Sequence, residues 1–514
     1  MAIMGKNIWD NLTTGMYSDS KIIFREYIQN ACDAIDAAKK QGLLGEKDGE
    51  VEIILNDQNR NISIKDNGLG VPSVDFQRKV GNVADSDKEI GKNKGFRGIG
   101  RLCGLAYCDK IVFTSKYKDE NIISIMIMDA KELRRLLYED KAKYTFGDVY
   151  DKIVEFSTEQ PDNINDHFFK VELFDIRKSN FDLLNKQGIQ EYLSFAAPVP
   201  YVNSFFYRSK IYEHAKNISA EIDEYKILIN GEQIFKNYKT HLYKGQKKND
   251  EIFNVDFEDF YADNGSLIAW MWYGVSTFHG ALTEENKAKR LRLRKENIQI
   301  GNPETLNPLF HESRGNSYFV GEVFAVSKDL IPNSQRDNFN ENDMRVIFEK
   351  KLKNFFKGML SKLYRSASDV RGYYGKISDY QKSKEEFDIK NQIGFISPSD
   401  KEKAEKTLEN KQGLAEKAQA DINKFEIAIQ KDTAAAMVAN RIKAQYESEF
   451  MPVIDAGEVT DSKPVTKDKY ITQSLPLDRK GRKLVTQIYQ IITDFLEDEN
   501  LAKELIEKIQ EGLK

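Results

Sequence analysis

The chain has 514 residues, of which 40% are hydrophobic and 31% are charged, and its net charge is −4 at neutral pH. This length predicts about three or four structural units, and no apolar run approaches the roughly 18 residues that span a bilayer. The charge balance gives no overall field that favours nucleic acid. The three cysteines and five histidines are too few and too scattered for a disulfide framework or a zinc site. Residues 1–11 lack the apolar core of a signal peptide, so we expect a cytoplasmic protein without membrane segments.

The first predicted element is a helix in the stretch Arg25–Ala34. Its Glu26, Asn30 and Asp33 are spaced four and three residues apart, so they stack on one face. Small residues beside them leave room for a ligand, and the opposite face carries apolar residues that can be buried: Ala34 and Ala37 on the first, and Phe24, Ile28 and Ile35 on the second. The alternative is the solvated face of an ordinary amphipathic helix.

Two predicted strands follow, Val51–Leu55 and Ile62–Ile64, joined by a polar turn. The second strand leads into Asp66, and Gly68 and Gly70 come directly after it. A carboxylate at a strand end, next to backbone that can approach a ligand closely, suits a purine, because the carboxylate accepts from an exocyclic amine. The alternative is an ordinary glycine-containing turn.

A glycine-rich segment, Lys92–Arg101, contains three glycines and four cations. It precedes an apolar run, Leu102–Tyr107, that could open a helix, and N–H groups at a helix N-terminus bind anions. The segment is neither a Walker loop nor a dinucleotide fingerprint. In this order and spacing, the helix, the strand end and the glycine-rich segment together predict a nucleotide site.

These three segments, Glu-x-x-x-Asn-x-x-Asp, Asp-x-Gly-x-Gly and the glycine-rich stretch, resemble the GHKL ATPase superfamily, which groups gyrase, the ninety-kilodalton heat-shock chaperone, histidine kinases and MutL. The resemblance implies a Bergerat-fold ATP site over residues 1–200: an α/β sandwich with a mixed sheet, helices on one face and a mobile lid. It implies that Glu26 is the general base that activates water, that Asn30 holds Mg²⁺ and that Asp66 binds the adenine amine. The other residues that it places at the nucleotide are Asp33, Gly68, Gly70, Lys94, Gly95, Arg97, Gly98 and Gly100.

The sequence departs from the superfamily in the predicted strand His167–Leu173. A Gly-Thr pair usually begins this strand and touches the phosphates, but here Phe168 and Phe169 stand in those places. This departure concerns the late-strand contact alone.

A second α/β unit is predicted over residues 201–375. Its segment Asp329–Asp337 resembles the middle domain of the ninety-kilodalton chaperone, and by that match Arg336 contacts the γ-phosphate once the domains close. The alternative is a surface arginine in a Pro-Asn turn. The strands predicted in this unit are Tyr225–Glu232, Leu267–Tyr273 and Phe319–Val326.

The densest basic run, Lys287–Lys295, alternates like a strand with one charged face. Two interpretations remain open for this run: a solvated strand face, or a surface that faces phosphates or a partner.

A helical hairpin or coiled coil is predicted over residues 376–450, beginning with a capping box at Ser399 and Glu402. Apolar residues recur there every seven positions, as Leu408, Ala415, Ile422 and Ile429. Residues 451–514 are predicted to form a proline-bearing linker and two amphipathic helices. We expect these helices to make a homodimer, with packing back onto the middle domain as the rival.

The leading interpretation is a slow Mg-ATP-dependent conformational machine, a chaperone-like ATP hydrolase that closes on ATP, resets on hydrolysis and acts on a protein client. The alternative is an ATP-gated nucleic-acid clamp or phage-defence subunit similar to MORC or MutL proteins, which the basic run favours and the acidic balance disfavours. A third interpretation is an ATP-binding scaffold that hardly hydrolyses. Gyrase and kinase activities are disfavoured, because neither a cleavage domain nor a histidine in a dimerisation hairpin is apparent.

Overall fold

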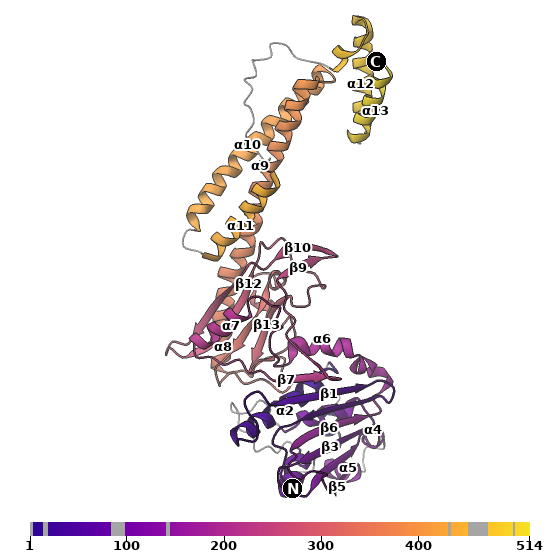
Figure 1. Cartoon of the computed structure of the whole chain (residues 1–514), viewed down its shortest axis with the longest axis vertical. Helices are drawn as coiled ribbons and strands as arrows, with labels where there is room; N and C mark the ends of the chain where they lie inside the picture. The colour runs from indigo at the N-terminus through magenta and orange to yellow at the C-terminus, as the bar shows by residue number, and fades with distance from the viewer. Residues whose placement is uncertain are drawn as a thin grey trace. The chain divides into compact units, whose positions relative to one another are not determined.

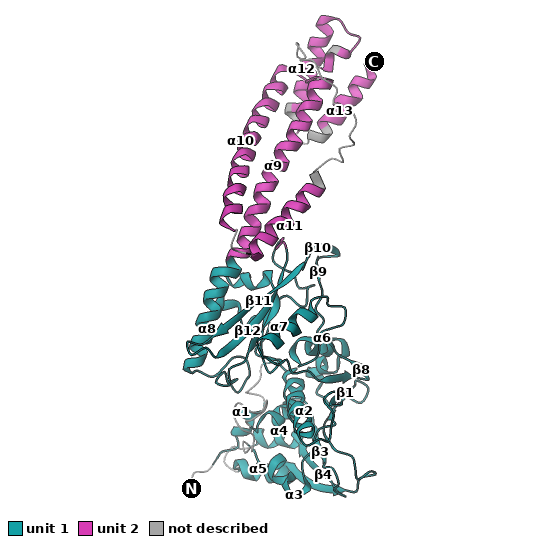
Figure 2. Cartoon of the chain, turned by 60° about the vertical axis from the view of Figure 1, so that its left-hand side comes forward, with its two compact units in different colours: residues 1–276, 280–361 teal, residues 277–279, 362–514 magenta. Residues whose placement is uncertain are grey.

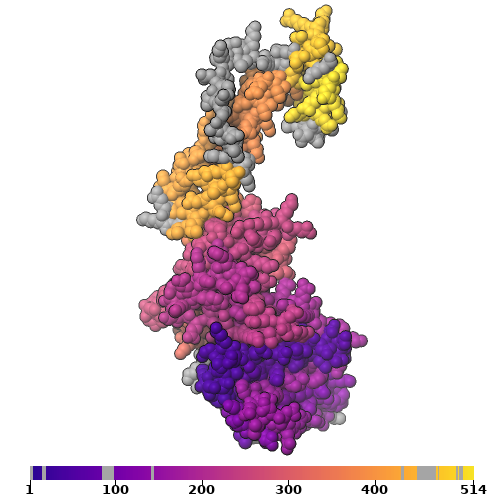
Figure 3. Space-filling view, viewed as in Figure 1, coloured from indigo at the N-terminus to yellow at the C-terminus, as the bar shows by residue number. Residues whose placement is uncertain are grey.

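The computed structural model describes residues 4–13, 19–83, 98–139, 144–429, 433–450, 471–496 and 499–513. The chain divides into two compact units (Figure 2). The larger unit comprises Met1–Ser276 and Gly280–Ser361, and the smaller unit comprises Thr277–His279 and Lys362–Lys514. The larger unit contains two main β-sheets, whose regions are in direct contact in the space-filling view (Figure 3).

The first sheet has eight strands in the order β5-β4-β3-β6-β2-β1-β7-β8 (Figure 1). All neighbours pair antiparallel except β1 and β7, so the sheet is mixed, as predicted. The β1–β2 hairpin, with Ile53 opposite Ile64, confirms the two predicted strands and the turn between them. The strands are β1 (Glu50–Asn56), β2 (Asn61–Asp66), β3 (Lys110–Lys116), β4 (Ile123–Asp129), β5 (Val154–Glu159), β6 (Phe168–Phe174), β7 (Lys226–Ile229) and β8 (Glu232–Gln233).

Helix α2 (Ile22–Lys40) packs across β1, β2 and β6. Its predicted core face is confirmed, since Phe24, Ile28 and Ile35 are all buried. With the mixed sheet, it forms the α/β sandwich of a Bergerat-type domain. The remaining helices of this region are α1 (Ile8–Leu12), α3 (Ser73–Phe76), η1 (Gln77–Gly81), η2 (Gly100–Ala106), α4 (Ala130–Tyr138), α5 (Phe146–Ile153), η3 (Lys178–Leu184) and α6 (Lys186–Ala196).

Strand β7 lies in the first sheet, beyond the predicted boundary at residue 200. It pairs in parallel with β1, with Ile227 opposite Val51. The side chain of Asn230 also bonds both the N–H and the C=O of Leu55, at 2.7 and 3.1 Å. Without β7, β1 would be an edge strand whose backbone is paired only on the β2 side, so this pairing satisfies its other side. The first sheet therefore ends later in the chain than the sequence predicted.

The second sheet has the order β11-β12-β15-β13-β14, and β12 and β15 are buried along nearly their whole length. Val323 of β15 lies opposite Met271 of β12 and Leu293 of β13. The predicted core strands of the second α/β unit are thereby confirmed. The elements of this region are α7 (Arg208–Asn217), β9 (His241–Lys244), β10 (Lys247–Glu251), β11 (Asn254–Tyr261), β12 (Leu267–Val275), β13 (Arg290–Lys295), β14 (Ile298–Gln299), η4 (Asn307–Leu309), η5 (Ser313–Tyr318), β15 (Val320–Ala325), α8 (Asp343–Phe355) and η6 (Phe356–Leu360).

Strand β13 shows the predicted alternation, but its charged face is buried. Arg292 is 6% exposed and Arg294 is fully buried. The Nε of Arg294 is paired with Glu322, which β15 brings into the same layer directly opposite Arg292. The interpretation as a solvated strand face is therefore wrong. The reason is that α6 covers this face of the sheet: Arg292 lies 4.3 Å from the centre of the Phe195 ring, and Arg294 donates to the C=O of Phe195 at 2.7 Å.

The smaller unit contains the long helices α9 (Ser361–Ile393), α10 (Pro398–Ala428) and α11 (Thr433–Phe450). The predicted seam in α10 is confirmed, since Ala415, Ile422 and Ile429 are buried. Helices α9 and α11 are in contact, because the rings of Tyr374 and Tyr446 lie 5.0 Å apart. The predicted boundary between residues 375 and 376 falls inside α9, so a continuous helix crosses it. Apart from these observations, the division into four domains stays a prediction.

The predicted capping box of α10 lies two residues too late. The N-cap is Ser397, whose hydroxyl accepts from the N–H of Asp400 at 3.2 Å. Pro398 occupies the first helical position, where its fixed φ starts the helix before Ser399 is reached.

The C-terminal segment forms η7 (Ile471–Ser474), α12 (Arg479–Phe495) and α13 (Glu499–Gly512), so the two predicted amphipathic helices are present. Val485, Tyr489 and Ile506 form their shared core. Most of the predicted linker, residues 451–470, lies outside the described residues. None of the described helices is long and apolar enough to cross a membrane.

Candidate functional site

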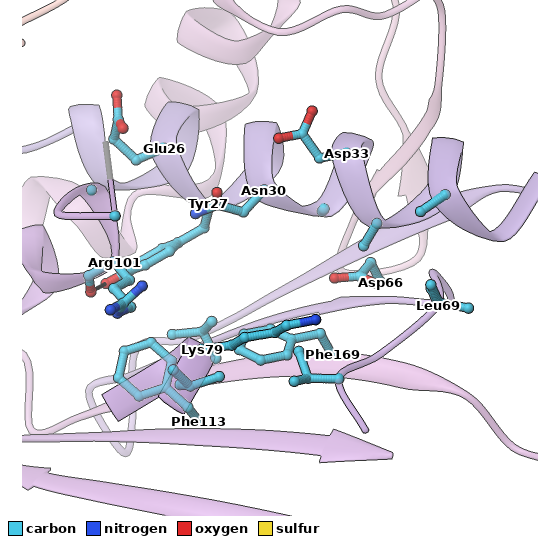
Figure 4. A pocket seen from close by; sticks show the side chains of 18 of the residues that line it. Glu26, Tyr27, Asn30, Asp33, Asp66, Leu69, Lys79, Arg101, Phe113 and Phe169 are labelled. Carbon is cyan, nitrogen blue, oxygen red and sulfur yellow. Dashed lines mark hydrogen bonds between the residues drawn. The ribbon is translucent and has the colours of Figure 1, made fainter. Parts of the chain in front are cut away.

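A cavity of about 530 Å³ lies beside α2 in the larger unit (Figure 4). Its walls come from α2, the end of β2 with the following loop, residues 98–101 and residues 332–336. Segments that are far apart in the sequence thus converge on one space. The predicted site residues that line it are Glu26, Asn30, Asp33, Asp66, Gly70, Gly98, Gly100 and Arg336.

Glu26 is a buried carboxylate on α2, only 9% exposed. Its Oε1 lies 3.4 Å from the Nε of Arg336 and 4.0 Å from the Nε of Arg25. The same Oε1 is buried and has no hydrogen-bond partner. The interpretation of the stripe as a solvated face is therefore wrong at Glu26. A buried acceptor without a hydrogen bond is costly, so this oxygen is suited to receive one from a bound molecule.

Arg336 is delivered by the loop after β15. Its φ of +52° is in the left-handed region, which is costly for a residue with a Cβ. Two backbone hydrogen bonds hold it there: its N–H donates to Asn333 at 3.1 Å, and its C=O accepts from Gly301 at 2.7 Å. The side chain is 9% exposed, and this burial lowers its pKa. The interpretation as a surface arginine is therefore wrong, because the loop turns the side chain inward against Glu26.

Arg25 ties the same loop to α2. Its NH2 group donates to the C=O of Gln335 at 3.1 Å, while its Nε is buried without a hydrogen-bond partner. Neighbouring positions on α2 therefore contact the Arg336 loop, one through a carboxylate and one through a guanidinium.

Asp66 is buried at the end of β2, and its Oδ1 accepts from the N–H of Gly68 at 2.8 Å. A Cβ on Gly68 would lie 2.6 Å from the carbonyl carbon of Ala34, and a Cβ on Gly70 would lie 2.2 Å from the carbonyl oxygen of Lys116. Gly70 also has a φ of +71°. The two glycines thus let the loop approach α2 and β3, which fixes Asp66 at the cavity. The sequence had suggested a close approach to the ligand, but only Gly70 lines the cavity.

The glycine-rich segment is described from Gly98 onward; Lys94, Gly95 and Arg97 lie outside the described residues. Gly98 and Gly100 line the cavity, and a Cβ on Gly100 would lie 2.4 Å from Oε2 of Glu26. Gly100 therefore gives the Glu26 carboxylate the room that it occupies. The predicted helix after this segment is present as η2.

Asn30 and Asp33 follow Glu26 along α2, and both are half-buried at the cavity. Among the described residues, no group of three or more His, Cys, Asp or Glu side chains could hold a metal ion. A single amide such as Asn30 fits Mg²⁺ in a different way, because Mg²⁺ keeps several waters and takes its remaining ligands from phosphates.

Several residues that line the cavity were not predicted as site residues: Tyr27, Lys79, Arg101, Phe113 and Phe169. Tyr27 is buried, and its hydroxyl donates to the C=O of Arg101 at 3.0 Å and accepts from the N–H of Gly104 at 3.2 Å. It thereby fixes the start of η2 against α2. The only sequence signal for Tyr27 was its position next to Glu26.

Phe113 and Phe169 lie on the strand side of the cavity, across from Glu26 and Asp33 (Figure 4). Their ring centroids are 6.4 Å apart. Phe169, one of the two phenylalanines that replace the usual Gly-Thr pair, is therefore part of an apolar floor. An apolar floor with a few polar groups above it is typical of pockets for small molecules.

The residues present fit a purine nucleotide. The cavity volume lies within the range of about 300 to 1,000 Å³ that is usual for ligand pockets. A buried carboxylate faces it at one end, Asp66, and a carboxylate with an unbonded oxygen meets a buried arginine at another, Glu26 with Arg336. Anionic phosphates suit the second end and an amine donor suits the first.

Comparisons with known proteins point the same way. Residues 17–149 match the family described as "Histidine kinase-, DNA gyrase B-, and HSP90-like ATPase". The chain is 27% identical over 176 residues to the chaperone protein HtpG of Fusobacterium nucleatum subsp. nucleatum, covering 29% of each chain. It is 31% identical over 134 residues to the chaperone protein HtpG of Borrelia garinii subsp. bavariensis, covering 23% of this chain and 21% of that one. An endoplasmin homolog of Hordeum vulgare is 28% identical over 131 residues, which is 22% of this chain and 16% of the relative.

The chain thus spans less than a third of the length of each of these curated relatives. The matched stretch contains α2, the β1–β2 hairpin, the loop after it and η2, which are the elements that build most of the cavity. Residues 17–149 of this chain are therefore similar to the ATPase domain of the histidine kinase-, DNA gyrase B- and HSP90-like family, and the relatives named above support its HSP90-like branch.

Proposed function

We propose that this chain is a Mg-ATP-dependent hydrolase that uses ATP to drive a chaperone-like conformational cycle in the cytoplasm. The observation that carries the proposal is the buried Glu26 carboxylate, whose unbonded Oε1 meets Arg336 at 3.4 Å beside the cavity. A carboxylate that orients a water and takes its proton, next to a cation for the phosphates, is what hydrolysis of a nucleoside triphosphate requires.

Each predicted residue has a role in this proposal. Asp66 accepts from the adenine amine, and Gly68 and Gly70 hold it in place. Glu26 orients the attacking water and takes its proton. Arg336 binds the γ-phosphate and stabilises the charge that develops on it. The remaining contacts to the nucleotide are assigned to Asp33, Lys94, Gly95, Arg97, Gly98 and Gly100.

Asn30 would hold the Mg²⁺ ion, which supplies charge neutralisation on the phosphates when bound.

The Glu26–Arg336 ion pair gives the proposed conformational cycle a physical basis. Arg336 cannot bind a phosphate fully while it is paired with Glu26, so binding of the phosphates releases the carboxylate for water.

Homodimerisation through the C-terminal region is part of the proposal. Four apolar side chains of α12 and α13 are 40% to 66% exposed: Leu484, Ile488, Ile491 and Leu505. A contiguous apolar face of this kind suits a second helix. A protein client is the expected partner of the cycle.

The test is ATP turnover with Mg²⁺ for the wild type beside Glu26→Gln, with nucleotide binding measured in both. We expect a loss of turnover of about 10² to 10⁴-fold in the variant, with binding retained. Glu46→Gln, an exposed acid of the same domain, is the matched control and should turn over normally. Wild-type protein that binds ATP without turnover would leave a nucleotide switch, and protein that does not bind ATP would overturn the assignment of the pocket.

A further inference from the structure

A second cavity, of about 780 Å³, lies in the larger unit. Its walls come from the start of α2, from α6, from residues 284–305 and from residues 335–337. Arg336 lines both cavities. The second cavity has no part in the roles assigned above, so its chemistry needs its own explanation.

The lining of this cavity carries more cations than acids. Among the described residues that line it, seven are cationic and four are acidic. Two of the acids are already neutralised, because Glu191 pairs with Lys287 at 2.8 Å and Glu284 pairs with Lys289. Arg290 also pairs with Glu304 at 3.0 Å and Arg336 pairs with Glu26 at 3.4 Å. The cations that remain in the wall are Lys21, Arg25 and Arg292, beside the acids Asp19 and Asp337. Part of the basic run Lys287–Lys295, whose purpose the sequence left open, faces this space.

Three guanidinium groups of the cavity have unused hydrogen-bond donors. The Nε atoms of Arg25, Arg290 and Arg292 are buried and lack any hydrogen-bond partner. Arg25 is only 4% exposed and Arg292 is 6% exposed. A buried N–H of a charged group without an acceptor is costly, so these groups fit an acceptor that comes from outside the chain.

Arg292 is held in place for such a contact. Its guanidinium lies 4.3 Å from the centre of the Phe195 ring, and its two terminal nitrogens donate to protein oxygens. Burial lowers its pKa to about 10, so it stays charged at neutral pH. Among the described residues, no carboxylate forms an ion pair with Arg292.

The start of α2 adds to the positive potential. Its N-cap is Lys21, and no acidic residue stands in its first turn. Acidic residues are favoured there because they offset the positive end of the helix dipole. Asp19, which lies just before the helix and also lines the cavity, accepts from the N–H of Lys21 at 3.0 Å. The helix end and Lys21 therefore add positive potential that Asp19 offsets in part.

We propose that this second cavity is a binding site for a small phosphate-bearing anion, such as inorganic phosphate or pyrophosphate. An oxyanion would accept from the buried Nε donors and pair with the cations left in excess, which guanidinium groups recognise with high specificity. A cavity of about 780 Å³ has room for a compact anion, whereas a nucleic-acid backbone is bound through phosphate contacts along a longer basic surface. The site does not depend on the proposed hydrolase activity.

The first experiment is a calorimetric titration of pyrophosphate into the full chain at constant ionic strength. ADP is present at saturation, so that the nucleotide pocket is blocked. We expect saturable binding that is about tenfold weaker in Lys21→Gln/Lys287→Gln, which removes two charges from the wall without touching a buried arginine. Lys178→Gln, an exposed lysine that lines neither cavity, is the matched control and should bind like the wild type. Thermal unfolding checks that all variants are folded.

Equal affinity in the wild type and the double variant, or no saturable binding, would overturn the proposal. The titration is repeated without ADP in Asp66→Asn, where pyrophosphate binding should survive. Unchanged ADP affinity in Asp66→Asn, with intact pyrophosphate binding, would overturn the proposed adenine contact and keep the anion site. The reverse result would overturn the anion site alone.

A second measurement separates two sources of the anion. In a single turnover of ATP, a phosphate sensor records when phosphate leaves the protein. If the cavity takes up the phosphate that hydrolysis releases, the double variant will release it sooner than the wild type. If the anion is supplied from solution, the release rate will be unchanged while pyrophosphate binding is weakened.

Discussion

Two groups of buried charges in the larger unit, one in the second sheet and one beside α2, differ in how fully they are paired. In the second sheet, Glu322 is fully buried and accepts from Arg294, Lys236, Tyr201 and Trp272. Arg294 also donates to two backbone carbonyls, at 2.7 and 2.8 Å. Burial raises the pKa of Glu322, but Arg294 and Lys236 outweigh it and bring the pKa to about 2. The carboxylate is thus held ionised by partners from its own chain.

Beside α2 the pairing is incomplete. Glu26 meets Arg336 through one oxygen that has no hydrogen bond, and the Nε of Arg25 and the amide of Gln29 are also buried without partners. Buried polar groups in folded proteins are nearly always satisfied, so the exceptions need an explanation. The comparison indicates that the Glu322 cluster stabilises the fold, whereas the Glu26 region is suited to bind ligands reversibly.

The largest expected effect concerns the Glu26–Arg336 pair. Replacing Arg336 by glycine removes the guanidinium but keeps the left-handed backbone, which glycine adopts without cost. We expect ATP turnover to fall by about 10³-fold or more, because a cation at the γ-phosphate supplies that order of rate enhancement. Steady-state turnover measures the loss, and thermal unfolding measures separately the stability that goes with the buried Glu26–Arg336 pair.

Arg336→Lys is the companion variant for this prediction. It keeps the charge but not the planar fork of donors, so most of the loss should persist. Normal turnover in Arg336→Gly would remove Arg336 from the chemistry and leave it as a contact that joins the loop to α2.

The next largest effect concerns the Glu322 cluster. Glu322→Gln leaves Lys236 and Arg294 buried without their common carboxylate, so we expect the free energy of unfolding to fall by about 3 to 5 kcal/mol. Denaturant unfolding followed by tryptophan fluorescence reports on this sheet, since Trp270 and Trp272 lie in β12. Glu172→Gln, which loses a partly exposed pair with Lys170, should cost less than about 1 kcal/mol. Similar losses of unfolding free energy in the two variants would contradict the distinction between the buried Glu322 cluster and a partly exposed ion pair.

A smaller effect is expected at the other end of the nucleotide pocket. Asp66→Asn keeps an oxygen that can accept from Gly68 but replaces the charged acceptor for the adenine amine. We expect the affinity for ADP to fall by about tenfold to a hundredfold, the worth of one charged hydrogen bond. Calorimetry measures the affinity, and Asp57→Asn in the exposed β1–β2 turn is the control. An unchanged affinity would place the adenine elsewhere.

The smallest expected effect is a dependence of the free energy of unfolding on pH, which comes from Lys236 in the Glu322 cluster. Burial, with the help of Arg294, lowers the pKa of Lys236 to about 7 from its ordinary 10.5. Between these values the unfolded chain binds the proton and the folded chain does not, so the free energy of unfolding rises with pH. Lys236→Met lacks this group and should be within about 1 kcal/mol of the wild type near pH 7, because the Glu322–Arg294 pair remains. The wild type should then gain on the variant as the pH rises through this window, and parallel curves of stability against pH would contradict the prediction.

The sequence was most informative where a local pattern carries the information. The β1–β2 hairpin, the strands β12 and β15 and the seam of α10 follow from alternation or from a seven-residue repeat, and the structure confirms them. The Glu26–Asn30–Asp33 stripe was found in the same way, because its spacing follows the turn of a helix.

Local patterns failed where the partner decides the outcome. The alternation of β13 shows that its two faces differ, but β15 determines that the charged face is covered, through Glu322. The strand β7 was recognised, yet nothing in its residues shows that its neighbour is β1. The start of α10 depends on Pro398, a local signal that the predicted capping box did not take into account.

By itself, then, the sequence determined the helix, the strand end and the glycine-rich segment of the nucleotide pocket, because each is a short motif whose spacing is set by its own backbone. Only the tertiary structure decided that Arg336 meets Glu26, that the glycines after β2 serve contacts with α2 and β3, and that part of the basic run faces a second cavity. Arg25 and Gln335, which join α2 to the Arg336 loop, are 310 residues apart in the chain. Contacts over such distances depend on how whole elements pack, and packing is a property of the folded chain rather than of any single stretch of it.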